Sequence, residues 1–191
     1  DRGFLTVAAA MALSLFAQLG LVAHLYGLLA TALGAQTAGF LMALATACAI
    51  GGRTVVAKLM PADANRRVVL SMSYAVQMVG SIALHAATDQ QTTLIVGGVC
   101  LFGLGIGNAT SMPPLIAQAE FVKTDIARVV ALIVAISQGL YAFAPAAFAA
   151  LLVSENAAHP RLGAGTQGYF LAALAFQAMA VASMPAGRGR P

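Results

Sequence analysis

Residues 4–29 read FLTVAAAMALSLFAQLGLVAHLYGLL, an apolar run that contains no Asp, Glu, Lys or Arg. A helix needs about 20 mainly apolar residues to cross the ~30 Å hydrocarbon core of a bilayer, and this run is long enough. Polar residues, glycines and prolines divide the rest of the chain into five more such runs. The six predicted spans are 4–29, 39–60, 68–87, 94–117, 129–153 and 167–184. The sequence therefore predicts an all-α membrane protein with one six-helix domain over residues 1–191.

The composition supports a lipid-exposed protein. Of 191 residues, 60% are hydrophobic and 8% are charged, and the mean hydropathy is +0.87. Soluble domains carry about 25% charged residues, so this chain has too few charges for a surface that faces water. Its basic residues are too few and too scattered for a nucleic-acid partner. Cys48 and Cys100 lie in apolar runs without metal-ligand spacing, so no disulfide, metal or other cofactor is predicted.

The basic residues predict the orientation. Lys and Arg are in excess on the cytoplasmic side of membrane proteins. Six spans put both termini, the second loop and the fourth loop on one side. That side holds Arg2, Arg53, Lys58, Arg66, Arg67, Lys123, Arg128, Arg188 and Arg190, whereas the other side holds Arg161. Both ends of the segment are predicted to be cytoplasmic, and the Ala- and Gly-rich composition indicates a bacterial inner membrane.

The loop between the second and third spans carries a family pattern. The second span ends in Gly-Arg, a short turn follows, and an Arg pair opens the third span. The matching positions are Gly52, Arg53, Arg66 and Arg67. This loop resembles the signature loop of the major facilitator superfamily, which joins the second and third helices of each six-helix half. Pro61 stands where the family has Asp, and Asp63 is displaced, a form of erosion that favours the C-terminal half.

Two later spans agree with this resemblance. The fourth span is rich in glycine, including a Gly103/Gly107 GxxxG pair that we interpret as helix packing rather than a moving part. The fifth span contains Pro145, and the fourth ends in Pro113 and Pro114. Proline removes a backbone donor, so a kink or break is expected at each of these three positions. Such sites either open a substrate cavity or simply shape the bundle.

The resemblance implies alternating access, in which two halves rock about a central site without covalent chemistry. The partners are then the lipid bilayer, a small solute, a coupling proton or ion, and an N-terminal half. Because the sequence begins Asp1-Arg2-Gly3 and runs directly into a span, we expect it to be part of a twelve-helix chain. Protease and nucleotide-binding motifs are absent, so no enzyme is predicted. The alternative is a self-contained six-helix channel or membrane adaptor that acts as an oligomer.

Polar residues within the spans are candidates for contact with a solute, because intramembrane polar groups face the bundle interior or a wet cavity. The family arrangement implies that the first, second, fourth and fifth helices line the cavity. The candidates are Gln18, His24, Tyr26, Asn108, Thr110, Gln138 and Tyr141. For each one, an ordinary interhelical hydrogen bond is the competing interpretation. No Asp or Glu lies in mid-span, so a titrating group is either His24 or lies outside this chain.

The signature loop supplies candidates for a conformational latch. These are Gly52, Arg53, Asp63, Arg66 and Arg67. Arg53 lies near the cytoplasmic end of its span, where two interpretations remain open. Its guanidinium either snorkels to the cytoplasm or pairs with an acid at a neighbouring helix end, such as Asp125 or Glu120.

Overall fold

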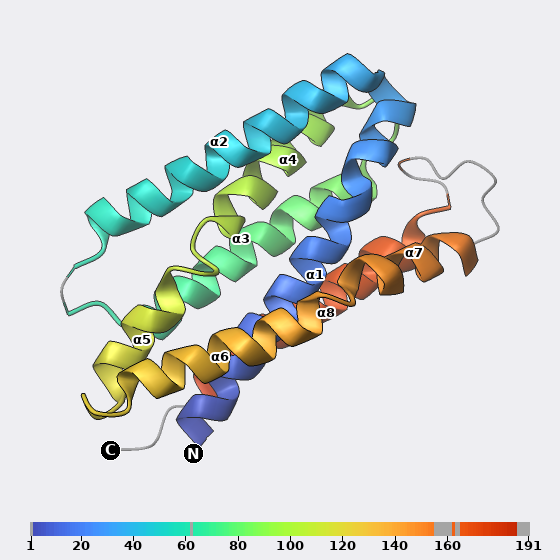
Figure 1. The fold of residues 1–191 in the computed structure, drawn as a ribbon. Helices are drawn as coiled ribbons and strands as arrows, with labels where there is room; N and C mark the ends of the chain where they lie inside the picture. The colour runs from blue at the N-terminus through green and yellow to red at the C-terminus, as the bar shows by residue number, and fades with distance from the viewer. Residues whose placement is uncertain (1, 62, 155–161, 163–164, 187–191) are drawn as a thin grey trace.

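The computed structural model describes residues 2–61, 63–154, 162 and 165–186 (Figure 1), and these form eight α-helices and no β-strand. The helices are α1 (Arg2–Leu33), α2 (Ala35–Leu59), α3 (Arg66–Ala86), α4 (Thr92–Ile106), α5 (Met112–Glu120), α6 (Ile126–Tyr141), α7 (Ala144–Ser154) and α8 (Gln167–Ala186). Five segments are long and apolar enough to cross a membrane: α1, α2, α3, α6 together with α7, and α8. Arg161, Arg188 and Arg190, which the orientation prediction uses, lie outside the described residues.

Two of the six predicted spans are divided. The span 94–117 becomes α4 and α5, and the span 129–153 becomes α6 and α7. Pro113 and Pro114 lie in the first turn of α5, where a missing N–H leaves no helical carbonyl unpaired. Pro145 lacks the N–H that would bond the Tyr141 carbonyl, so the chain turns at 142–143 before α7 begins. The predicted kinks are thus places where one helix ends and another begins.

The first connection is shorter than the sequence predicted. Residues 30–38 were expected to form a loop, but α1 and α2 are separated by Gly34 alone. Gly34 has φ +87°, in the left-handed region that glycine adopts without steric cost. The two helices therefore form a tight hairpin, seen where α1 meets α2 in Figure 1.

Helix α4 lies between α2 and α3 and touches both backbones (Figure 1). On the α2 side, a Cβ on Gly103 would lie 2.5 Å from the Ala45 carbonyl oxygen, and one on Gly107 would meet the Ala49 carbonyl. On the α3 side, a Cβ on Gly98 would lie 3.1 Å from the Gly80 carbonyl oxygen. The glycines therefore serve close packing, which in lipid relies on van der Waals contact.

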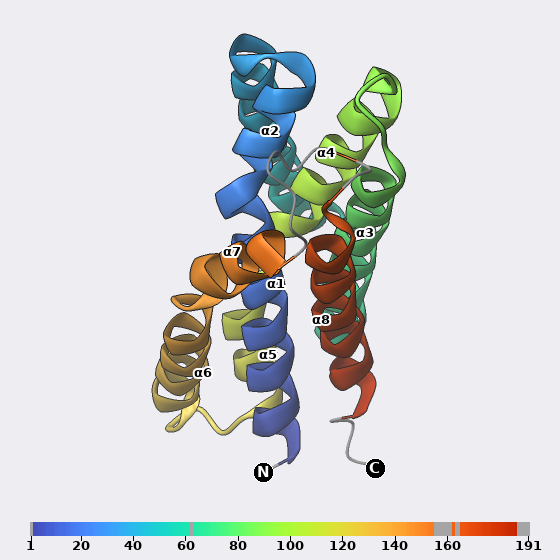
Figure 2. The same ribbon diagram turned by 90° about the vertical axis from the view of Figure 1, so that its right-hand side faces the viewer.

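Helix α1 is the centre of the bundle and contacts α2, α6, α7 and α8. Of its 32 residues 14 are buried, whereas α2 buries four and α6 and α7 bury two each. Large apolar side chains on these outer helices are exposed, among them Phe40 of α2 and Val153 of α7. Figure 2 shows that α1 begins and α8 ends at the same end of the bundle. The outer faces of α2, α6 and α7 are therefore available to lipid or to another helical unit.

Candidate functional site

A cavity of about 310 Å³ lies between α1, α2, α4 and the end of α6. Its lining is Leu15, Gln18, Leu19, Val22, Leu25, Met42, Ala45, Thr46, Ala49, Phe102, Ile106 and Tyr141. We call it the central cavity. Three of these side chains carry a polar group, and no charged side chain among the described residues lines it. The four contributing segments correspond to the first, second, fourth and fifth predicted spans.

The central cavity lies halfway along every segment that lines it. Gln18 is at the middle of α1, Ile106 at the middle of residues 92–120, and Tyr141 beside the middle of residues 126–154. With ~30 Å of hydrocarbon to cross, a group at mid-helix is about 15 Å from either interface. The cavity therefore lies near the middle of the apolar segments that line it.

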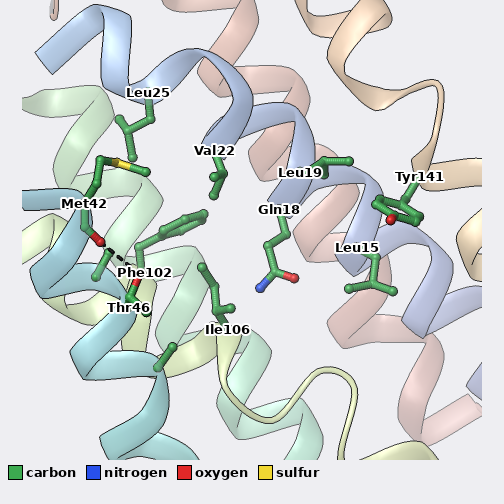
Figure 3. A pocket seen from close by; sticks show the side chains of 12 residues that line it. Leu15, Gln18, Leu19, Val22, Leu25, Met42, Thr46, Phe102, Ile106 and Tyr141 are labelled. Carbon is green, nitrogen blue, oxygen red and sulfur yellow. Dashed lines mark hydrogen bonds between the residues drawn. The ribbon is translucent and has the colours of Figure 1, made fainter. Parts of the chain in front are cut away.

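Gln18 is the most unusual side chain of the central cavity. Only 8% of its surface is exposed, and its Nε2 has no hydrogen-bond partner. Figure 3 shows the side chain extending from α1 into the cavity, toward Ile106 of α4. The Thr46 hydroxyl already donates to the Met42 carbonyl at 3.0 Å. An unpaired buried amide costs about 1–3 kcal/mol, so a ligand that accepts a hydrogen bond here would be favoured.

A second polar site lies where α1 begins and α8 ends, built around Arg67 at the first turn of α3. Its guanidinium is 3% exposed and donates to Glu120 through Nε and Nη2, each over 2.7 Å. Nη1 donates to Thr6 Oγ1 at 2.9 Å and to the Met184 carbonyl at 3.0 Å. Nη2 also donates to the Gly3 carbonyl at 2.9 Å. We call these five residues the Arg67 cluster; it uses all five guanidinium donors and joins α1, α3, α5 and α8.

Local sequence explains why Arg67 points inward. Asn65 caps α3 by accepting from the backbone N–H groups of Arg67 and Val68. Capping fixes where α3 begins and therefore which of the paired arginines faces the bundle. Arg67 is buried, whereas Arg66 is partly exposed and Asp63 lies exposed in the preceding turn. The latch candidates thus separate into one buried residue of the Arg67 cluster and two residues at the surface.

Arg53 of α2 contacts α4 rather than an acid. Its Nε donates to the Gly107 carbonyl at 2.8 Å, and its Nη2 donates to Thr110 Oγ1 at 3.2 Å. Both acceptors belong to the irregular stretch between α4 and α5, where the Gly107 carbonyl also accepts from Ser111 Oγ at 3.4 Å. Glu120, which the sequence offered as a partner of Arg53, pairs with Arg67 instead. Gly52, which precedes Arg53 in α2, packs closely against α4, because a Cβ on Gly52 would lie 2.5 Å from the Leu104 carbonyl oxygen.

The structure brings two of the seven cavity candidates together, Gln18 and Tyr141. His24 Nε2 lies 3.0 Å from the Pro145 carbonyl and so links α1 to α7. Asn108 donates to Ser73 Oγ at 3.2 Å and borders a separate apolar groove between α2, α3 and α4. The remaining candidates lie elsewhere: Thr110 beside Arg53, and Tyr26 and Gln138 at the exposed surface.

Several residues of the central cavity and the Arg67 cluster carry no signal in the sequence. Phe102, Ile106 and Met42 form much of the cavity wall, yet apolar residues within apolar spans all look alike. Thr6 could have been found as the one hydroxyl in the first turn and a half of α1, close to the predicted basic face. Its role depends on α3 approaching α1, which only the packing reveals.

Comparisons with family models, with curated proteins and with solved structures give no match for this chain. The function therefore has to be argued from the central cavity and the Arg67 cluster.

Proposed function

We propose that this chain forms one six-span half of a secondary transporter that moves a small solute by alternating access. The observation that carries the proposal is the central cavity. It lies at mid-depth, is lined by the first, second, fourth and fifth spans, and contains an unpaired amide. Here α4 with α5, and α6 with α7, count as single broken spans, as discontinuous helices do around transporter sites.

The resemblance to the major facilitator superfamily agrees with this lining, since the family uses the same four helices of each half. The resemblance rests on Gly52, Arg53, Arg66 and Arg67 and on the glycines of α4. In such a carrier, a second six-helix half covers the cavity, and the exposed apolar faces of α2, α6 and α7 are suited to meet it or the lipid. The solute then crosses without covalent chemistry, driven by its own gradient or by a coupled proton or ion.

The Arg67 cluster supports a two-state mechanism. It closes one end of the bundle by joining four helices through a single buried side chain. Basic residues at the beginnings of α1 and α3 and the end of α2 lie at this end, which is the predicted cytoplasmic face. A charged, multi-bonded contact of this kind is bistable, because it is either fully made or open to water. We propose that it holds the cytoplasmic end closed in one state.

Counterflow tests the proposal. The full-length carrier, with both six-helix halves, is reconstituted in proteoliposomes preloaded with an unlabelled solute panel, and uptake of trace labelled solute is followed. A carrier exchanges labelled for unlabelled solute and so accumulates label transiently above equilibrium, with saturation. A channel equilibrates the label without overshoot, and that result would replace the carrier with the oligomeric channel.

A further inference from the structure

We infer that the solute of the central cavity is uncharged and largely apolar, and that it carries a hydrogen-bond acceptor which Gln18 Nε2 recognises. This inference rests on the proposed function and narrows it to a substrate class. It begins from the lining, in which nine of the twelve side chains are apolar. A charged solute would lose its hydration there without gaining an ion pair, which is costly at low dielectric.

Gln18 supplies an unpaired hydrogen-bond donor to the central cavity. Its Nε2 is a buried donor without a partner, and the side chain forms part of the cavity wall, where it extends from α1 toward Ile106 of α4 (Figure 3). Gln77 of α3 is also buried with an unpaired amide, but it packs against Gly105 of α4. Of these two glutamines, Gln18 is the one positioned to meet a ligand. Discrimination for an acceptor is strong at such sites, because an analogue without it leaves the donor unpaired.

A lipid chain does not satisfy this site. The ester groups of a phospholipid stay near the interface, about 15 Å from the midplane where Gln18 lies. An acyl chain that entered the cavity would bring no acceptor to Nε2. A compact molecule with a carbonyl or ether oxygen would bring one, and about 310 Å³ accommodates a ring of modest size.

The nearest basic side chain does not change the expected substrate class. Arg53 follows Ala49 of the cavity wall by one helical turn, or ~6 Å along α2. Its Nε and Nη2 are directed at Gly107 and Thr110 of the α4–α5 connection. An anion would have to draw the guanidinium away from both acceptors. The experiment therefore includes an anionic probe.

Binding is measured by ¹⁹F NMR with the protein in nanodiscs, using empty nanodiscs to subtract partitioning into lipid. The probes are 4-fluoroacetophenone, which has a carbonyl acceptor, 1-ethyl-4-fluorobenzene, which has the same shape without it, and 4-fluorobenzoate, which is charged. We expect saturable binding of the ketone, at least tenfold tighter than that of the hydrocarbon or the benzoate. Gln18→Leu should weaken ketone binding about tenfold and leave hydrocarbon binding unchanged.

Gln77→Leu is the matched control, since it removes an unpaired buried amide outside the central cavity, and it should alter neither affinity. Thermal unfolding of each variant shows that it is folded. Equal binding of ketone and hydrocarbon, tightest binding of the benzoate, or unchanged ketone binding in Gln18→Leu would each overturn the inference. Because this assay needs no transport, ketone binding without counterflow would reject the carrier and retain the site. Counterflow of an anionic solute would retain the carrier and reject the inferred substrate class.

Discussion

The Arg67 guanidinium of α3 meets the Glu120 carboxylate of α5 at two points, with Nε–Oε1 and Nη2–Oε2 distances of 2.7 Å. Planar two-point pairing is the geometry in which Arg and a carboxylate interact most strongly. Arg67 is 3% exposed and Glu120 is 35% exposed, so the pair lies at the edge of the bundle with its cation inside. Glu120 is therefore the accessible member of the ion pair, and it is the residue to substitute.

Glu120→Gln should destabilise the protein, because it leaves the Arg67 charge buried without its counter-charge. Breaking a fully buried pair costs about 3–5 kcal/mol, and water around Glu120 reduces the expected loss to about 1–3 kcal/mol. The loss is measured as a lower melting temperature in detergent. Asp125→Asn is the control, since Asp125 is exposed and its side chain makes no capping bond to α6. Equal melting temperatures for the two variants would contradict a stabilising Arg67 cluster.

The glycine contacts predict a contrast between two adjacent positions of α2. A Cβ on Gly52 would lie 2.5 Å from the Leu104 carbonyl oxygen, whereas a Cβ on Gly51 meets nothing within 4 Å. Gly52→Ala must push α4 away from α2 and should cost about 1–3 kcal/mol, as overpacking does. Gly51→Ala should be neutral or slightly stabilising, because alanine is the better helix former. Thermal unfolding compares them: stabilisation of both would show that helix propensity, not packing, decides, and a similar loss in both would contradict the contrast in packing.

The sequence predicted an all-helical chain with long apolar helices and most of the helix positions, and the structure has five segments long and apolar enough to cross a membrane. Sequence reasoning could not find where spans break into two helices, since a proline predicts a kink and a break equally well. Pro113 and Pro114 became the start of α5, and Pro145 an early residue of α7. It also placed a connection at residues 30–38 where Gly34 alone separates α1 and α2, because Gln36 and Thr37 mark a polar break but fit within a helix.

The candidate site was predicted in part, for a similar reason. Gln18 and Tyr141 are polar residues at mid-span, and the sequence therefore predicts them as cavity residues. Asn108 and His24 are likewise polar residues within predicted spans, so the sequence does not distinguish them from Gln18 and Tyr141. In the structure, Asn108 bonds to Ser73 and His24 to the Pro145 carbonyl instead. Whether a neighbouring group satisfies a polar side chain depends on how its helix is rotated about its axis. Apolar residues are spread too evenly around these spans for the sequence to fix that rotation.

Arg53 provides the third prediction, since it holds the irregular stretch between α4 and α5. Arg53→Gln should lose the bonds to the Gly107 carbonyl and Thr110, at a cost of about 1.5–3 kcal/mol for charge-assisted hydrogen bonds. Lys58→Gln removes an exposed cation from the same helix and should change stability by no more than about 0.5 kcal/mol. Proteolysis or hydrogen exchange at 107–111 locates the effect. Unchanged exchange there would mean that Arg53 acts elsewhere, as a snorkelling residue would.

Cys48 of α2 and Cys100 of α4 give the fourth prediction, because Cys48 packs against α4 within one helical turn of Cys100. A Cβ on Gly103 would lie 3.0 Å from Cys48 Cβ, so the two helix backbones are close at this point. We expect α2 and α4 to move as one body during transport. Copper phenanthroline should therefore join the two cysteines within one chain, with retention of counterflow by the joined protein.

Cys100→Ser is the control for this cross-link, since it removes one thiol with little change in volume. Mass spectrometry after proteolysis identifies the joined peptides, and counterflow is measured before and after reduction. If the disulfide forms and stops transport reversibly, α2 slides against α4 and the glycine contact is a moving part. If transport continues, the motion that opens the central cavity does not require α2 to slide against α4, because the α2–α4 contact has been held fixed throughout.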